Sequence, residues 1–113
     1  MPSAELKRHW DRVAELGCII THRPTPTLHH CMSGSMVPII GLKSQNQRTS
    51  DWFVLPLDIE YHVGDSGIHT IGVRTWEKRY GTQVELLNQL SRMLGYNVWI
   101  KDGLDRKKAG SVL

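Results

Sequence analysis

The chain has few cysteines and no long apolar run, and both absences narrow the classes of protein to which it can belong. Its 113 residues include only two cysteines, Cys18 and Cys31, too few for the disulfide framework of a small secreted domain. No stretch approaches the roughly 18 consecutive apolar residues of a membrane span. The amino terminus carries early charges with no apolar segment behind them, so no secretory signal is expected. We therefore expect a cytoplasmic protein without a membrane partner.

An excess of charge of one sign is also nearly absent. Lysine and arginine outnumber aspartate and glutamate by 14 to 11, which gives a formal net charge of +3. Such a charge suits an anionic partner such as nucleic acid but does not require one. A chain of 113 residues with 40% hydrophobic residues can bury one modest core. The sequence therefore predicts a single domain over residues 1–113.

The first half of the chain predicts a helix followed by a β-hairpin. Ser3 is a suitable cap for a helix over residues 4–16, with His9 expected at its solvent-exposed surface. Residues 27–31 and 52–57 are short runs with β-branched, aromatic and leucine side chains, typical of strands. We expect these two strands to pair with each other.

The second half predicts two further helices. Apolar residues recur at helical spacing until Gly81, and Thr82 then caps a helix that Gly95 ends. Residues 33–50 are polar and rich in glycine and serine, which indicates a long loop of the kind that is often functional. Residues 100–113 are expected to form a flexible polar tail. The whole pattern indicates an α+β fold.

Four of the six histidines fall in two clusters, His29 with His30 and His62 with His69. A divalent ion binds neutral imidazole nitrogens, and a water attacking a phosphodiester needs a nearby base. Adjacent residues of a strand point to opposite faces, so one histidine of the pair can bind a metal while the other acts on water. Because turn residues 63–67 separate His62 from His69, their meeting at one ion is an inference, and each remains open to interpretation as an ordinary buried or solvated histidine.

Several short segments follow one another in an order that covers most of the chain: residues 6–19, 28–30, 54–57, 67–69 and 75–83. In this order they resemble the HNH, or ββα-metal, nucleases, and among these the small phage-encoded Ref-like recombination-enhancement nucleases. The resemblance implies a ββα-metal hairpin flanked by an N-terminal helix and two C-terminal helices.

The resemblance also implies a role for each clustered histidine. His30 looks like the general base, and His29, His62 and His69 look like ligands of one divalent metal ion. The residues leave the ion's identity open among Zn²⁺, Mg²⁺, Mn²⁺ and Ni²⁺. The asparagine that braces the loop in this family has no counterpart here, and Asp51 is the candidate substitute.

The chain departs from the family at a structural zinc site that many relatives carry. The corresponding positions here are Cys18, Thr21, Asp58 and Tyr61, so three of the four zinc ligands are missing. A structural zinc is therefore not expected, and Cys18 is expected to be a small buried hydrophobic residue. A core without this zinc can need a second subunit, which makes a homodimer the oligomer to consider.

The function that the resemblance implies is metal-dependent cleavage or nicking of DNA, linked to phage or prophage recombination in a bacterial host. DNA is then the expected partner, and members of such a family can depend on a RecA filament for targeting. Two alternatives stay open: a DNA-binding module without catalysis, and an interaction protein stabilised by a closed metal site. The basic residues expected to contact DNA are Arg23, Lys43, Arg48, Arg74, Lys78 and Arg79.

Overall fold

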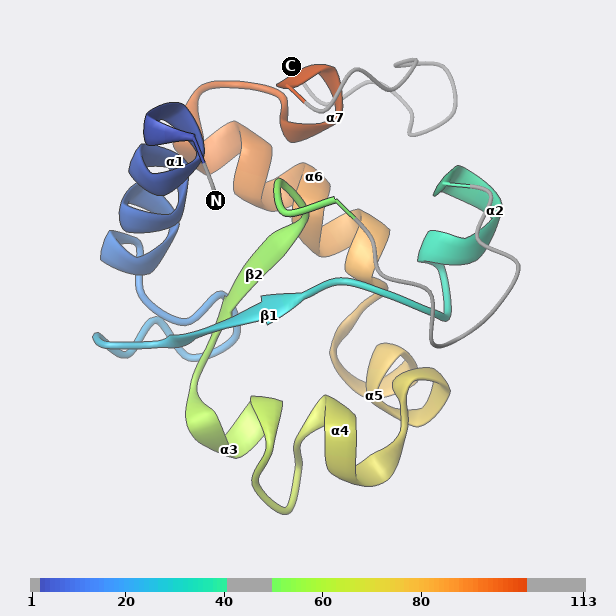
Figure 1. The fold of residues 1–113 in the computed structure, drawn as a ribbon. Coiled ribbons are helices and arrows are strands. Elements are labelled where there is room, and N and C mark those ends of the chain that lie inside the picture. Colours follow the sequence, from blue (N-terminus) through green and yellow to red (C-terminus); the bar gives the residue numbers. More distant parts are fainter. Residues whose placement is uncertain (1–2, 41–49, 102–113) are drawn as a thin grey trace.

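The computed structural model of the chain describes residues 3–40 and 50–101, and it combines helices with a small β-sheet (Figure 1). Lys43, Arg48 and residues 102–113 of the expected tail lie outside the described residues. The elements follow in the order α1 (Ala4–Glu15), β1 (Thr27–His30), α2 (Met36–Ile40), β2 (Val54–Leu57), α3 (Ile59–His62), α4 (Ile68–Ile71), α5 (Val73–Tyr80), α6 (Gln83–Leu94) and α7 (Val98–Lys101).

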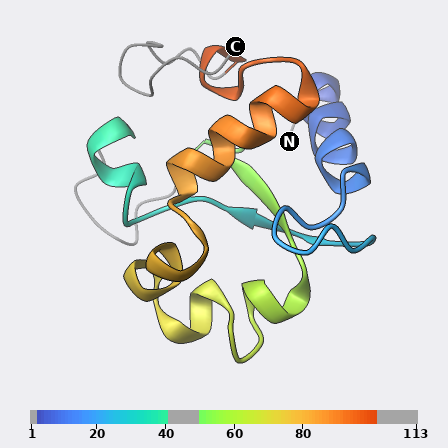
Figure 2. The same ribbon diagram turned by 180° about the vertical axis from the view of Figure 1, so that it is seen from behind.

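The two strands form an antiparallel pair in the middle of the molecule. The register places His29 opposite Leu55 and His30 opposite Val54. Helices α1, α6 and α7 lie on one side of the pair, whereas α3, α4 and α5 lie on the other, and both views show this division (Figures 1 and 2). The expected strand pairing and the mixed α+β character are therefore confirmed.

The long helices begin and end where their capping residues predict. The Ser3 hydroxyl accepts a hydrogen bond from the Leu6 amide at the start of α1. Thr82 and Glu85 form a complete capping box at the start of α6, and Gly95 ends α6 in the left-handed conformation with φ of 84°. No helix in the described ranges has the length and apolar character needed to cross a membrane.

Two segments expected to be irregular contain helices instead. Helix α2 lies within the expected loop over residues 33–50, and α7 includes residues 100 and 101 of the expected tail. The cause is burial of large apolar side chains. Met36 has no exposed surface, and neither does Trp99, whose ring contacts Phe53 in a tilted arrangement at a centroid distance of 4.7 Å. Packing against the core therefore outweighs the polar composition of the flanking residues.

His9 is the clearest error of the sequence-based expectations, because it is buried and not at the surface of α1. Only 2% of the residue is exposed. Its Nε2 lies 3.1 Å from the Trp52 carbonyl oxygen, which can only accept, so Nε2 donates and Nδ1 accepts from the Tyr96 hydroxyl at 2.6 Å. His9 therefore joins α1 to the segment before β2 and to the residues between α6 and α7.

We predict that His9→Leu lowers the free energy of unfolding by about 1–3 kcal/mol, because the Trp52 carbonyl and the Tyr96 hydroxyl lose their partner. Burial lowers the pKa of His9 below its ordinary value of 6.5, with Arg12 acting in the same direction and the Trp52 hydrogen bond opposing both. The unfolded chain then binds the proton more readily, so the contribution of neutral His9 is present above pH 6.5 and decreases as the pH falls.

Urea denaturation of wild type and His9→Leu at pH 7.5 and pH 5.5 checks this prediction. The difference between the two proteins should be larger at pH 7.5. Tyr96→Phe, which removes only one hydrogen bond of His9, is the matched control and should lower the stability by less. Equal stability of wild type and His9→Leu at pH 7.5 would contradict the assigned role.

Candidate metal centre

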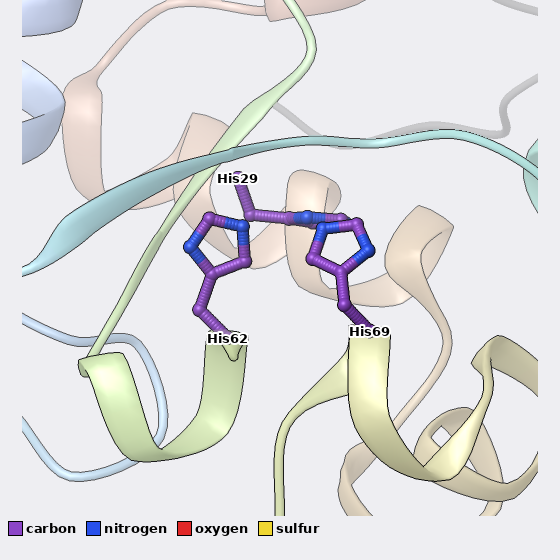
Figure 3. A group of neighbouring side chains, drawn as sticks. All are labelled: His29, His62 and His69. Carbon is purple, nitrogen blue, oxygen red and sulfur yellow. The ribbon is translucent and has the colours of Figure 1, made fainter. Parts of the chain in front are cut away.

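Three of the four clustered histidines meet below strand β1 (Figure 3). Each of His29, His62 and His69 offers one ring nitrogen, and these nitrogens all lie within 4.8 Å of one another. Zinc with bond lengths of about 2.1 Å holds its ligand nitrogens about 3.4 Å apart, so small side-chain movements suffice to close the group on an ion. The described residues therefore contain a cluster that could hold a metal ion.

The three histidines come from separate elements and differ in exposure. His29 lies in β1 and is buried, His62 is the last residue of α3 and is half-buried, and His69 lies in α4 and is exposed. A Cβ at Gly67 would lie 2.6 Å from the carbonyl oxygen of His62, so only glycine allows the chain to approach this closely. This close turn brings α4 back beside α3, and the cluster is open to solvent at His69.

The hydrogen bond of His29 determines which of its nitrogens carries the proton. Gln83 Oε1 lies 3.0 Å from Nε2 of His29 and also accepts the Met32 amide, while Gln83 Nε2 donates to the Met32 carbonyl at 2.9 Å. Because the Gln83 oxygen can only accept, Nε2 of His29 carries the proton. Nδ1 of His29 keeps its lone pair and is buried without a hydrogen-bond partner. A metal ion is the partner that such an atom fits.

His62 is oriented in the same way by a residue of β1. Its Nδ1 lies 2.8 Å from the Thr27 hydroxyl, and that hydroxyl donates its own hydrogen to the Leu57 carbonyl. Thr27 is therefore left to accept, which places the proton of His62 on Nδ1 and the lone pair on Nε2. His29 and His62 thus each have one nitrogen bonded to the protein and the other available as a ligand.

Burial favours the neutral imidazole that a metal requires. It lowers the pKa of His29 from 6.5 to about 4; the Gln83 hydrogen bond opposes this shift, whereas the neighbouring His62 and His69 add to it. Burial, followed by His69, also lowers the pKa of His62. Both rings are consequently neutral at pH 7, and no proton has to leave them before an ion binds.

Gln83 is itself held by a second polar residue. The Glu77 carboxylate accepts the backbone amide of Gln83 at 2.7 Å and both the amide and the hydroxyl of Ser35. These hydrogen bonds connect the segment after β1 to α5 and α6. They also hold the start of α6 in place, so the side-chain amide of Gln83 stays against His29. Both residues lie in the last segment that carries the resemblance, but local sequence contains no sign of their contact with a residue some 50 positions away.

His30 does not belong to the three-histidine cluster. As expected for adjacent residues of a strand, its ring has other neighbours than that of His29: its Nε2 is buried and lies 3.2 Å from Oδ1 of Asp51, a charge contact without hydrogen-bond geometry. The Trp10 indole donates to the Asp51 carbonyl oxygen at 2.9 Å and meets the His30 ring edge-on. Asp51 thus connects the segment before β2 to α1 and places its carboxylate beside His30.

The basic residues expected to contact DNA occupy different places. The Arg23 guanidinium lies 3.5 Å from the Asp58 carboxylate, which also accepts the Thr21 hydroxyl. These contacts use the side chains at two of the positions compared above with a zinc site, where Cys18 is fully buried as expected. The basic residues exposed on α5, next to α4 and its His69, are Arg74, Lys78 and Arg79.

In comparisons with known proteins, the chain matches no family model, no curated protein and no solved structure. The geometry of its own residues therefore carries the functional argument.

We predict that Gln83→Leu weakens zinc binding about 10- to 100-fold, because mutation of a residue that is hydrogen-bonded to a metal ligand typically lowers metal affinity by this factor. Competition with a chromophoric chelator at pH 7 measures the affinity. Gln89→Leu, the same change in the same helix outside the site, should bind zinc like wild type. Because Gln83 also bonds to Met32, circular dichroism must show that the variant is folded at the temperature of the titration. A folded Gln83→Leu with wild-type affinity would contradict the role of Gln83.

Proposed function

We propose that the chain is a metal-dependent DNA endonuclease or nickase of the ββα-metal type. The observation that carries this proposal is the convergence of His29, His62 and His69 beside a strand whose next residue, His30, faces a carboxylate. A metal site and a separate histidine near a carboxylate are the groups that hydrolysis of a phosphodiester requires.

The number and exposure of the ligands favour a catalytic site over a structural one. Within the described ranges, the metal-capable group contains only His29, His62 and His69, and the exposed His69 leaves it open on one side. Structural zinc sites usually have four protein ligands, whereas catalytic sites keep a position for water or substrate. When bound, a divalent ion supplies Lewis acidity for the phosphate and lowers the pKa of a bound water.

His30 is the residue proposed to take the proton of the attacking water. The adjacent Asp51 carboxylate favours a proton on Nε2 of His30, which leaves Nδ1 with the lone pair that a base needs. The same carboxylate stabilises the imidazolium that forms when the proton is taken. Asp51 is thus a positioning residue for His30 in addition to any part in bracing the loop.

Helix α5 is the proposed contact with the DNA backbone. Its exposed Arg74, Lys78 and Arg79 lie on the side of the strands where α4 supplies His69 (Figure 1). Contacts with phosphates position a nucleic acid without reading its sequence, so the proposed cleavage has low sequence specificity. We include in the proposal a role in recombination of phage or prophage DNA in the bacterial cytoplasm, with a RecA filament as the targeting partner.

Plasmid nicking tests the function directly. We expect metal-dependent conversion of supercoiled to nicked plasmid by wild type, with Mg²⁺, Mn²⁺, Ni²⁺ or Zn²⁺, with and without RecA and ATP, and no cleavage in EDTA. His30→Ala should lower the rate about 10²- to 10⁴-fold while metal affinity is unchanged, because only the base is lost. His69→Ala should lose both metal binding and cleavage.

His22→Ala is the control, since His22 is exposed and outside the metal-capable group. It should nick plasmid like wild type. If folded wild type binds DNA and metal but cleaves nothing under all these conditions, the DNA-binding module without catalysis becomes the better interpretation. If removal of metal unfolds the chain, an interaction protein stabilised by a closed metal site becomes the better interpretation.

We further predict that Asp51→Asn lowers the nicking rate at least about tenfold, and by less than His30→Ala, because the amide keeps the shape of the side chain but cannot stabilise an imidazolium. Metal affinity should stay at the wild-type value. Asp11→Asn, an exposed acidic residue of α1, is the matched control and should leave the rate unchanged. Equal rates for Asp51→Asn and wild type would remove Asp51 from the proposed mechanism.

A further inference from the structure

A second candidate binding site lies on the opposite side of the strands from the histidine cluster. A cavity of about 380 Å³ is formed there by α1, the end of α7, Tyr96 and Trp52. None of the three clustered histidines lines it. Figure 1 shows α1 and α7 on one side of the strand pair and α3 and α4, which carry His62 and His69, on the other.

Positive charge dominates the lining of this cavity. Arg8, Arg12 and Lys101 face a single carboxylate, that of Glu5. Glu5 and Lys101 are both exposed and form an ion pair at 3.0 Å, so they largely neutralise each other. Two guanidinium groups remain. The cavity therefore presents the donors that bind phosphate or carboxylate groups in a fork geometry.

The two arginines differ in how firmly the structure holds their guanidinium groups. Arg12 is held in place, because its Nη2 donates to the Leu94 carbonyl at the end of α6 and its guanidinium lies 5.1 Å from the centre of the Tyr96 ring. This uses only one of its five N–H donors. Arg8, one helical turn earlier on the same face of α1, is exposed and makes no hydrogen bond or ion pair with another described residue.

The wall of the cavity is continuous with the residues around His30. Trp52 lines the cavity, and its carbonyl oxygen accepts a hydrogen bond from the buried His9. The preceding residue, Asp51, lies 3.2 Å from His30. The cavity and His30 are therefore connected through two adjacent residues of the segment before β2, Asp51 and Trp52.

We propose that Arg8 and Arg12 bind a phosphate of the DNA backbone that lies beyond the cleaved bond. This inference rests on the proposed function for the identity of the ligand as DNA. The aromatic side chains of Trp52 and Tyr96 supply a surface for the attached sugar or base. The cavity extends the DNA contact from α5 across the strands to α1, and neither Arg8 nor Arg12 was among the basic residues that the sequence indicated.

Arg8→Ala and Lys7→Ala form a matched pair for the test, because both remove one positive charge from exposed positions of α1 and only Arg8 lines the cavity. Fluorescence anisotropy in EDTA, with labelled single-stranded and duplex DNA over a range of salt concentrations, measures binding without cleavage. We expect Arg8→Ala to raise the Kd about tenfold and to lower the salt slope by about 1. Lys7→Ala should change the Kd less than about twofold.

The outcomes separate this inference from the proposed function. Equal effects of Arg8→Ala and Lys7→Ala would show a general attraction of DNA to positive charge and would overturn the proposed site. The site would also be overturned if the wild type bound neither single-stranded nor duplex DNA. If plasmid nicking is observed but Arg8→Ala binds DNA like wild type, the proposed DNA contact in the cavity is wrong and the proposed nuclease function is retained. If Arg8 specifically supports DNA binding but no metal gives cleavage, the proposed DNA contact in the cavity is retained and the proposed nuclease function is wrong.

Discussion

The candidate site depends on one buried hydrogen bond, between Nε2 of His29 and Oε1 of Gln83. This bond places the proton of His29 on Nε2 and leaves Nδ1 buried without a hydrogen-bond partner. A buried polar atom that lacks a partner costs about 1–3 kcal/mol, and a cation at Nδ1 would remove that cost. The same burial lowers the pKa of His29 to about 4, so protonation does not satisfy the atom at neutral pH. The fold thus keeps one nitrogen in the form that a metal ion uses.

This hydrogen bond also links the site to both halves of the molecule. Gln83 is the first residue of α6, which packs against β2, and its backbone amide is bound by Glu77 of α5. His62 and His69 come from α3 and α4, where the close turn at Gly67 sets their separation. The cluster therefore lies where the two sets of helices meet at strand β1. An ion held there would join β1, α3 and α4.

Local signals explain what the sequence could predict, and distant contacts explain what it could not. The start of α1 and both limits of α6 follow from Ser3, Thr82 and Gly95, because capping is decided within one turn of helix. The opposite orientations of His29 and His30 follow from the alternation of a strand. The partners of the buried histidines, in contrast, could not be predicted from local sequence. They lie 43 to 87 residues away for His9 and 54 residues away for His29, and no periodicity in the sequence reports such distances.

The polar contacts of the two adjacent histidines of β1 separate metal binding from the proposed proton transfer. His29 is oriented from α6 and has neighbours in α3 and α4. His30 lies 3.2 Å from the carboxylate of Asp51, whose backbone carbonyl accepts a hydrogen bond from Trp10 of α1. A change on the α1 side would therefore affect His30, the proposed base, without touching the proposed ligands, and a change in α3 or α4 would affect metal binding without moving His30. A closed structural metal site has no need of the second set of contacts, because nothing beside its ligands has to be positioned. The orientation of His30 toward a carboxylate is thus the feature that argues for catalysis over a purely structural metal.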